Sequence, residues 1–105
     1  MEEKLPSAYR RFASDQPRII KAYEELGEAC LVEGPLDRRT AELVKIGIAV
    51  GAKLDGAVHS HVRRALEAGA APDEIRHAVR LALTTVGFPT MMKALSLAGD
   101  VLEKS

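Results

Sequence analysis

The chain has a single cysteine, Cys30, among its 105 residues. One cysteine can form neither an internal disulfide nor a cysteine-based metal site. Cys30 falls among the apolar positions of a helical pattern, where a thiol usually packs as a small hydrophobe and is chemically inert. The sequence therefore predicts a structural role for Cys30.

Aromatic residues are also scarce, with two Tyr, two Phe and no Trp, although 47% of the residues are hydrophobic. The apolar mass comes from Ala, Leu, Val and Ile, a mixture that suits closely packed helices. We expect a single domain over residues 1–105. A chain of this length buries only about 60–65% of the surface that its unfolded form exposes, so its core is modest. Self-association would be an easy way to bury more surface.

The chain has no excess of either charge, because 15 Lys and Arg residues balance 15 Asp and Glu residues. No electrostatic field then favours nucleic acid or an anionic membrane. The N-terminal residues 1–11 lack the apolar core of a signal peptide. The longest mainly apolar run, residues 46–52, is far short of the roughly 20 residues that span a membrane. We therefore expect a cytoplasmic protein without nucleic-acid or membrane partners.

No segment alternates apolar and polar residues for long, which predicts an all-α fold. Glycines and prolines leave short loops, which are typical of neighbouring antiparallel helices. We expect a compact bundle of five to six helices, with Asp37 and Asp55 as N-caps of the third and fourth. The expected helices cover residues 7–13, 15–33, 37–51, 55–69, 72–86 and 89–102.

The third expected helix is apolar on every side from Ile46 onward, which predicts that it is buried at the centre of the fold. Glu42 lies one turn before this apolar part. Either the carboxylate is buried with the helix, or it forms a surface ion pair with Arg38 or Lys45, which are both within helical reach.

Two histidines, His59 and His61, lie two residues apart on the fourth helix and so point in nearly opposite directions. His61 shares an apolar stripe with Ala57 and should face inward, as a proton-transfer group or as a core histidine bonded to a backbone carbonyl. His59 shares a row with Asp55 and should face solvent or a partner subunit. Because the two rings diverge, we predict no metal site on this helix unless a subunit interface adds ligands.

A buried Glu42 facing His61 across two consecutive helices would form an acid–base pair.

Several motifs resemble the carboxymuconolactone decarboxylase and alkylhydroperoxidase D family. Residues 36–50 resemble its first core segment, an LD-x-K/R-x-x-EL start followed by an apolar helix. Residues 61–69 match the pattern H-x-x-x-A-L-x-x-G, and residues 71–75 match the opening of the next helix. Residues 87–95 match G-x-P-x-x-x-x-A-L. The order and spacing of these motifs make the resemblance, over about residues 20–102, fairly specific.

The resemblance implies an all-helical unit that assembles into trimers or hexamers. In the alkylhydroperoxidase D branch, a C-x-x-C pair precedes the histidine, and a glutamate on the preceding helix completes a proton relay to the reactive thiol. The resemblance places that glutamate at Glu42 and that histidine at His61. The two cysteines fall on Leu54 and Ala57, which can be neither nucleophile nor resolving thiol.

The decarboxylase branch does not use the cysteine pair, and resemblance to it implies decarboxylation of a lactone acid by proton transfer without a cofactor. Lys45 or Lys53 could then hold the carboxylate of the substrate. The favoured hypothesis is a cofactor-free lyase or isomerase that acts on a small organic acid, with candidate catalytic residues Glu42, His61 and His59. Its candidate substrate-binding residues are Lys45, Lys53, Leu54 and Ala57. The alternative is a non-catalytic binding or assembly protein of the same fold. A peroxidase that acts through Cys30 is the least favoured hypothesis.

Overall fold

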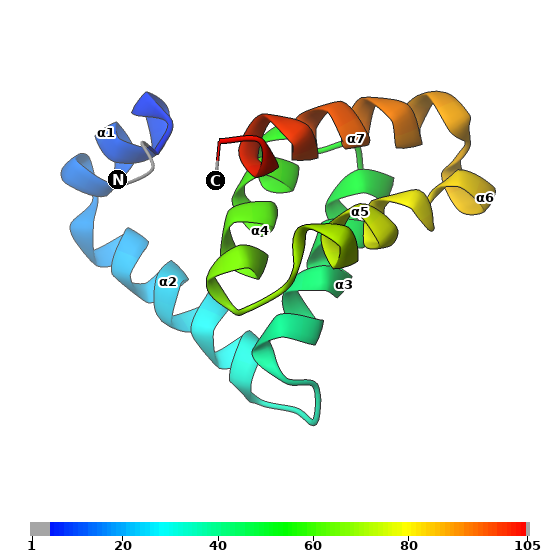
Figure 1. Cartoon of the computed structure of the whole chain (residues 1–105). Helices are drawn as coiled ribbons and strands as arrows, with labels where there is room; N and C mark the ends of the chain where they lie inside the picture. The colour runs from blue at the N-terminus through cyan, green and yellow to red at the C-terminus, as the bar shows by residue number, and fades with distance from the viewer. Residues whose placement is uncertain (1–4, 105) are drawn as a thin grey trace. The chain divides into compact units, whose positions relative to one another are not determined.

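The computed structural model describes residues 5–104, and this part of the chain contains seven helices and no strand (Figure 1), so the predicted all-α class is confirmed. No helix in this part is both long enough and apolar enough to cross a membrane. The helices are α1 (Ser7–Asp15), α2 (Pro17–Val32), α3 (Arg38–Gly51), α4 (Asp55–Glu67), α5 (Pro72–Arg80), α6 (Leu83–Val86) and α7 (Phe88–Leu102).

Backbone contacts divide the chain into two units, residues 1–35 and residues 36–105. The first unit contains α1 and α2. Pro17 is in the first turn of α2, where its missing N–H costs no helical hydrogen bond. Neither helix has a buried residue, and Leu26 and Cys30 are exposed. The prediction that Cys30 packs as a buried hydrophobe is therefore wrong, because the apolar stripe of α2 remains uncovered.

The second unit is a bundle in which α3 packs against α4, α5 and α7. Its core is built from small and branched side chains, as the shortage of aromatic residues predicts. The buried apolar residues are Ile46, Ala49, Val50, Val58, Val62, Ala65, Ala70, Ile75, Val79, Met91, Ala94, Ala98, Val101 and Leu102.

The central place of α3 agrees with the sequence, but the expectation that it is buried on every side is wrong. Ile46 is fully buried, whereas Ile48 is 63% exposed and Val44 is also exposed. Val44 and Ile48 are four residues apart and share the face of α3 that points away from the core. An apolar helix surface therefore remains open on this unit.

The helix expected over residues 72–86 is broken. It ends at Arg80, and Leu81 and Ala82 form a turn before the single turn of α6. The Ala82 N–H donates to the Val79 carbonyl three residues back, the tighter bonding that often ends an α-helix. This break leaves Leu83 exposed and raises the number of helices above the expected five to six.

The expected N-cap role of Asp55 is wrong. Asp55 is the first residue of α4 and Leu54 is its N-cap, so the carboxylate of Asp55 does not cap the helix. The two adjacent methionines of α7 differ in burial, because Met91 is buried and Met92 is exposed. Neighbouring residues on α7 point about 100° apart, so only one of the pair faces the core.

The C-termini of α3 and α4 have the same hydrogen-bonding pattern. At the end of α3, the Lys53 N–H donates to Val50 and the Leu54 N–H donates to Ala49, at 3.1 and 3.0 Å. The equivalent two hydrogen bonds close α4 around Gly69. This Schellman motif requires a left-handed residue, with φ of 59° at Lys53 and 96° at Gly69. Glycine is the usual residue there, so Lys53 is the unusual one.

Hydrogen bonds fix the start of α3 to its N-cap residue and to α5. The Asp37 carboxylate accepts a 2.7 Å hydrogen bond from the Thr40 N–H, which confirms the predicted N-cap. Glu74 accepts hydrogen bonds from the Ala71 N–H at 2.9 Å and from the Arg39 guanidinium at 2.6 Å. These two donors, the backbone N–H first, lower the pKa of Glu74. Glu74 thus joins the start of α5 to α3.

We predict that Glu74→Gln makes the stability of the protein less dependent on pH in the acid range. Because the folded pKa of Glu74 is below its ordinary value of 4.5, its stabilising contribution is complete above that pH. The contribution is lost as the pH falls through the folded pKa. Urea denaturation should therefore show a lower free energy of unfolding for the variant at pH 7, with the difference from wild type shrinking below about pH 4.

The matched control is Glu67→Gln, which changes an exposed carboxylate at the end of α4. Glu67→Gln should leave the acid dependence unchanged. An equal pH dependence in wild type and Glu74→Gln would contradict the assignment.

Candidate functional site

The candidate site is the contact between Glu42 of α3 and His61 of α4. Glu42 is four residues before Ile46 and therefore shares its core-facing side, where the carboxylate is 1% exposed. His61 Nδ1 lies 2.8 Å from Glu42 Oε1. The predicted contact across the two helices is confirmed, and the alternative of a surface ion pair for Glu42 is wrong.

The carboxylate of Glu42 sets the orientation and the tautomer of the His61 ring. With an ionised carboxylate, the Nδ1–H donates to Oε1 and leaves a lone pair on Nε2. Within residues 5–104, Nε2 has no hydrogen-bond partner, and no buried side-chain nitrogen or oxygen there is unsatisfied. Since the side chain of His61 keeps 15% exposure, Nε2 reaches solvent. An imidazole held in this way can take up a proton at Nε2 and return it.

His59 does not join this pair. Its Nε2 lies 3.0 Å from Asp100 Oδ2 of α7, so the partly exposed ring meets a helix of its own chain, where solvent or a partner subunit was expected. Asp55, in the same row of α4, forms a 3.1 Å ion pair with Lys93 of α7. In residues 5–104, no three His, Cys, Asp or Glu side chains are grouped so that they could hold a metal ion.

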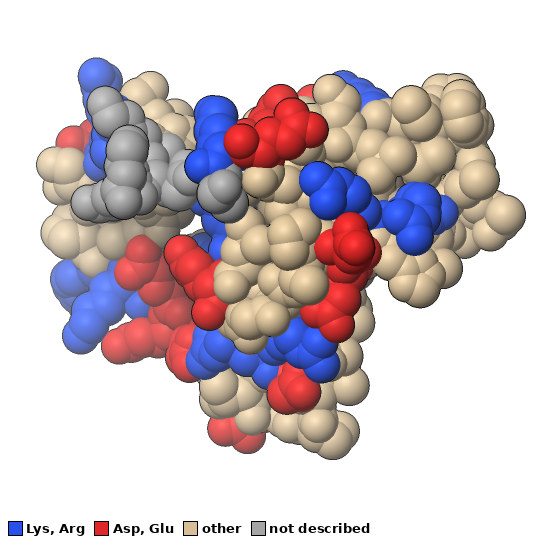
Figure 2. All heavy atoms as spheres, viewed as in Figure 1, with Lys and Arg blue, Asp and Glu red and all other residues tan. Residues whose placement is uncertain are grey.

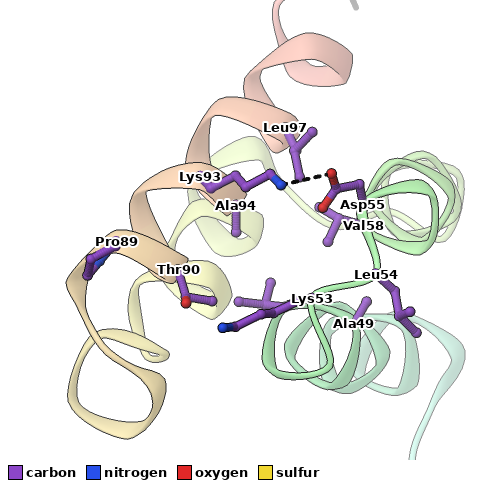
Figure 3. A pocket seen from close by; sticks show the side chains of 11 residues that line it. Ala49, Lys53, Leu54, Asp55, Val58, Pro89, Thr90, Lys93, Ala94 and Leu97 are labelled. Carbon is purple, nitrogen blue, oxygen red and sulfur yellow. Dashed lines mark ion pairs between the residues drawn. The ribbon is translucent and has the colours of Figure 1, made fainter.

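A cavity of about 280 Å³ lies between α3, α4 and the start of α7, all within the second unit (Figure 3). Its polar lining comes from Lys53, Asp55, Thr90 and Lys93. Its walls are mainly apolar. The apolar residues are Ala49, Val50, Leu54, Val58, Pro89, Ala94 and Leu97.

The cavity includes some of the predicted substrate-binding residues but not the acid–base pair. Lys53 and Leu54 line it, whereas Lys45 and Ala57 do not. Glu42 and His61 are also absent from its lining. Glu42 lies seven residues before the lining residue Ala49, which is about 10 Å along the helix. Neither member of the acid–base pair therefore lines this cavity.

Sequence reasoning missed the residues that α7 brings to the cavity and to His59. Thr90, Lys93 and Asp100 look in the sequence like ordinary polar positions on a helix. No spacing or motif links them to Lys53, Asp55 or His59, because the link exists only where α7 crosses α3 and α4.

The described residues form an all-helical unit in which a glutamate and a histidine meet across two consecutive helices. The chain belongs to the carboxymuconolactone decarboxylase family, whose profile matches residues 17–100. No curated protein matches the chain at a significant level.

Two solved structures resemble the chain in fold. One is the apo form of a carboxymuconolactone decarboxylase family protein from Legionella pneumophila, with a TM-score of 0.79, 23% identity, and coverage of 93% of this chain and 87% of that one. The other is a provisionally assigned carboxymuconolactone decarboxylase from Burkholderia xenovorans LB400, with a TM-score of 0.69, 20% identity, and coverage of 95% and 81%. At these identities the likeness establishes the fold alone.

We predict that neutral His61 carries its proton on Nδ1. Histidine in water prefers the Nε2–H tautomer, but the Glu42 carboxylate accepts only from a protonated Nδ1. Two-bond ¹H–¹⁵N correlation spectra at a pH where the rings are neutral should show this tautomer. Glu42→Leu should shift His61 towards Nε2–H.

The exposed His77 on α5 is the internal control and should give the same spectrum in both proteins. A wild-type His61 that is mainly in the Nε2–H form would contradict the proposed role of Glu42 as acceptor.

Proposed function

We propose that this carboxymuconolactone decarboxylase family protein carries out acid–base chemistry, without a cofactor, on a small organic acid. His61 transfers the proton and Glu42 orients its ring. The observation that carries the proposal is the 2.8 Å contact between a buried carboxylate and an imidazole whose second nitrogen reaches solvent.

The pair suits both a decarboxylation and an isomerisation. In a decarboxylation, the bond between the carboxylate carbon and its neighbour breaks, and its electron pair stays on the neighbouring carbon. That carbon takes a proton from Nε2 of the His61 imidazolium, which then regains a proton from solvent. In an isomerisation, neutral Nε2 removes a proton from one carbon and returns it to another. In both cases the Glu42 carboxylate stabilises the positively charged ring.

We assign no proton transfer to His59, because its ring is held by Asp100 on another side of α4. Thiol chemistry also lies outside the proposal. Leu54 and Ala57 occupy the two positions where the alkylhydroperoxidase D branch has its cysteines, and Cys30 matches neither position.

We predict that His61→Gln abolishes proton transfer while leaving the fold intact. The assay incubates the protein in D₂O with small β-keto and β,γ-unsaturated acids and follows deuterium uptake and loss of CO₂ by NMR. Because general acid–base groups typically contribute about 10²–10⁴-fold, the variant should lose at least about 100-fold in rate. Glu42→Gln, which keeps the shape of the side chain but not its charge, should lose less.

His77→Gln is the matched control, since His77 is an exposed histidine on α5. It should retain the wild-type rate. Normal turnover by a folded His61→Gln protein would refute the proposal.

The second candidate is a non-catalytic binding or assembly protein of the same family. The observation that favours it is that neither Glu42 nor His61 lines the cavity. This candidate predicts that a small acid binds and shifts the NMR signals of the cavity residues, without deuterium uptake or CO₂ loss for any acid tested.

We further propose that the chain associates into trimers or hexamers. The support is the open apolar face of α3 with Val44 and Ile48, together with exposed Phe88 and Met92 on α7. Figure 2 shows charges of both signs mixed over the molecule, while the area over α6 and the start of α7 is largely uncharged. Exposed apolar patches are common at protein–protein interfaces.

We predict by light scattering a mass three or six times the 11.4 kDa of one chain. Ile48→Glu should reduce this mass, because it places a charge on the open face of α3. The monomer should still fold, since Ile48 contributes nothing to the core. The exposed substitution Lys104→Glu should leave the mass unchanged, and a monomeric wild type would contradict the proposal.

A further inference from the structure

The cavity between α3, α4 and α7 has the features of a small-molecule site. Its volume of about 280 Å³ is near the lower end of the range for such sites. Val50, Val58 and Ala94 in its walls also belong to the core of the unit, so these walls are fixed by packing. A site of this size and lining suits a ligand with a small apolar body.

The charges at the cavity leave one cation available. Lys93 and Asp55 neutralise each other through their 3.1 Å ion pair. Lys53, within residues 5–104, has no carboxylate within ion-pair distance. In Figure 3 its side chain extends towards Thr90, whose hydroxyl also lines the cavity. An ammonium group and a hydroxyl near apolar walls are complementary to a carboxylate on an apolar body.

The backbone at Lys53 gives a second, independent indication. Lys53 holds the left-handed position of a Schellman motif that the same chain fills with glycine, Gly69, at the end of the next helix. A side chain at such a position is strained, and strained residues gather at functional sites. The negative C-terminal end of α3 favours a cation nearby, but a lysine at Ala52 would supply it without a left-handed backbone.

We propose that this cavity binds a small monocarboxylic acid, with its carboxylate on Lys53 and Thr90 and its apolar body against Val58 and Ala94. The site lies about 10 Å from Glu42 along α3 and includes neither member of the acid–base pair. The ligand class follows the small organic acid of the proposed function. Binding is nevertheless measurable without turnover, so either proposal can fail alone.

The experiment titrates ¹⁵N-labelled protein with benzoate, its neutral analogue benzamide, and inorganic phosphate. Benzoate should shift the amide signals of Lys53, Thr90 and Ala94. Lys53→Met should weaken benzoate binding at least about tenfold, the usual size of the loss of one hydrogen bond to a charged group. Benzamide and phosphate should bind wild type more weakly than benzoate, because each lacks either the charge or the apolar body.

Three variants separate a binding role of Lys53 from a structural one. Lys53→Gly should melt a few degrees higher than wild type, because glycine relieves the left-handed strain, yet it should lose benzoate binding as Lys53→Met does. Gly69→Lys introduces the same strain at the end of α4 and should melt lower, with benzoate binding unchanged. Lys104→Met removes an exposed lysine away from the cavity and should change neither property.

Several results would overturn the inference. They are unchanged benzoate binding by Lys53→Met, benzamide or phosphate binding as tight as that of benzoate, and a lower melting temperature for Lys53→Gly. If His61→Gln loses deuterium exchange while benzoate fails to shift the amide signals of the cavity residues, the proposed function stands and the binding site is refuted. If benzoate binds at the cavity but the wild-type protein shows no deuterium exchange, the binding site stands and the proposed function is refuted.

Discussion

The hydrogen bond between Glu42 and His61 is the constraint on which the arrangement of α3 and α4 depends. Removing the partner of a buried polar group typically costs about 1–3 kcal/mol, because that group is left without a hydrogen bond. Glu42 is 1% exposed and therefore needs the ring of His61 at 2.8 Å. The buried side chains of Ile46, Val58 and Val62 hold the two helices at the separation that this contact requires.

One helix, α3, positions both the Glu42–His61 pair and the cavity. Asp37 starts it, Glu42 orients the candidate proton-transfer group, and Lys53 ends it at the rim of the cavity. About two turns of α3 separate Glu42 from the cavity, so the two lie at different places along the same helix. The same helix keeps Val44 and Ile48 outside the core, and this exposed apolar face supports the proposed self-association of the chain.

Membership of the family does not by itself give the chemistry of this chain. The family and the all-helical fold follow from residues spread over the match, 17–100, while thiol chemistry requires two particular residues. The family resemblance places those two positions at Leu54 and Ala57, one exposed at the cap of α4 and one packed against the core. A family assignment therefore establishes the scaffold, and the activity has to be argued from Glu42, His61 and the cavity.

By itself, the sequence determined the all-α class, most helix ends and the inward direction of His61, while it left Glu42 open between burial and a surface ion pair. These are local properties, because the helical period decides which residues share a face and residues such as Asp37 mark where a helix starts. Only the tertiary structure decided what covers each face. It left Ile48 and Cys30 exposed, joined Asp55 to Lys93 and His59 to Asp100, and formed the cavity in front of Lys53. The two pairs and the cavity depend on the crossing of α3 and α4 by α7, and contacts between distant segments leave no period in the sequence.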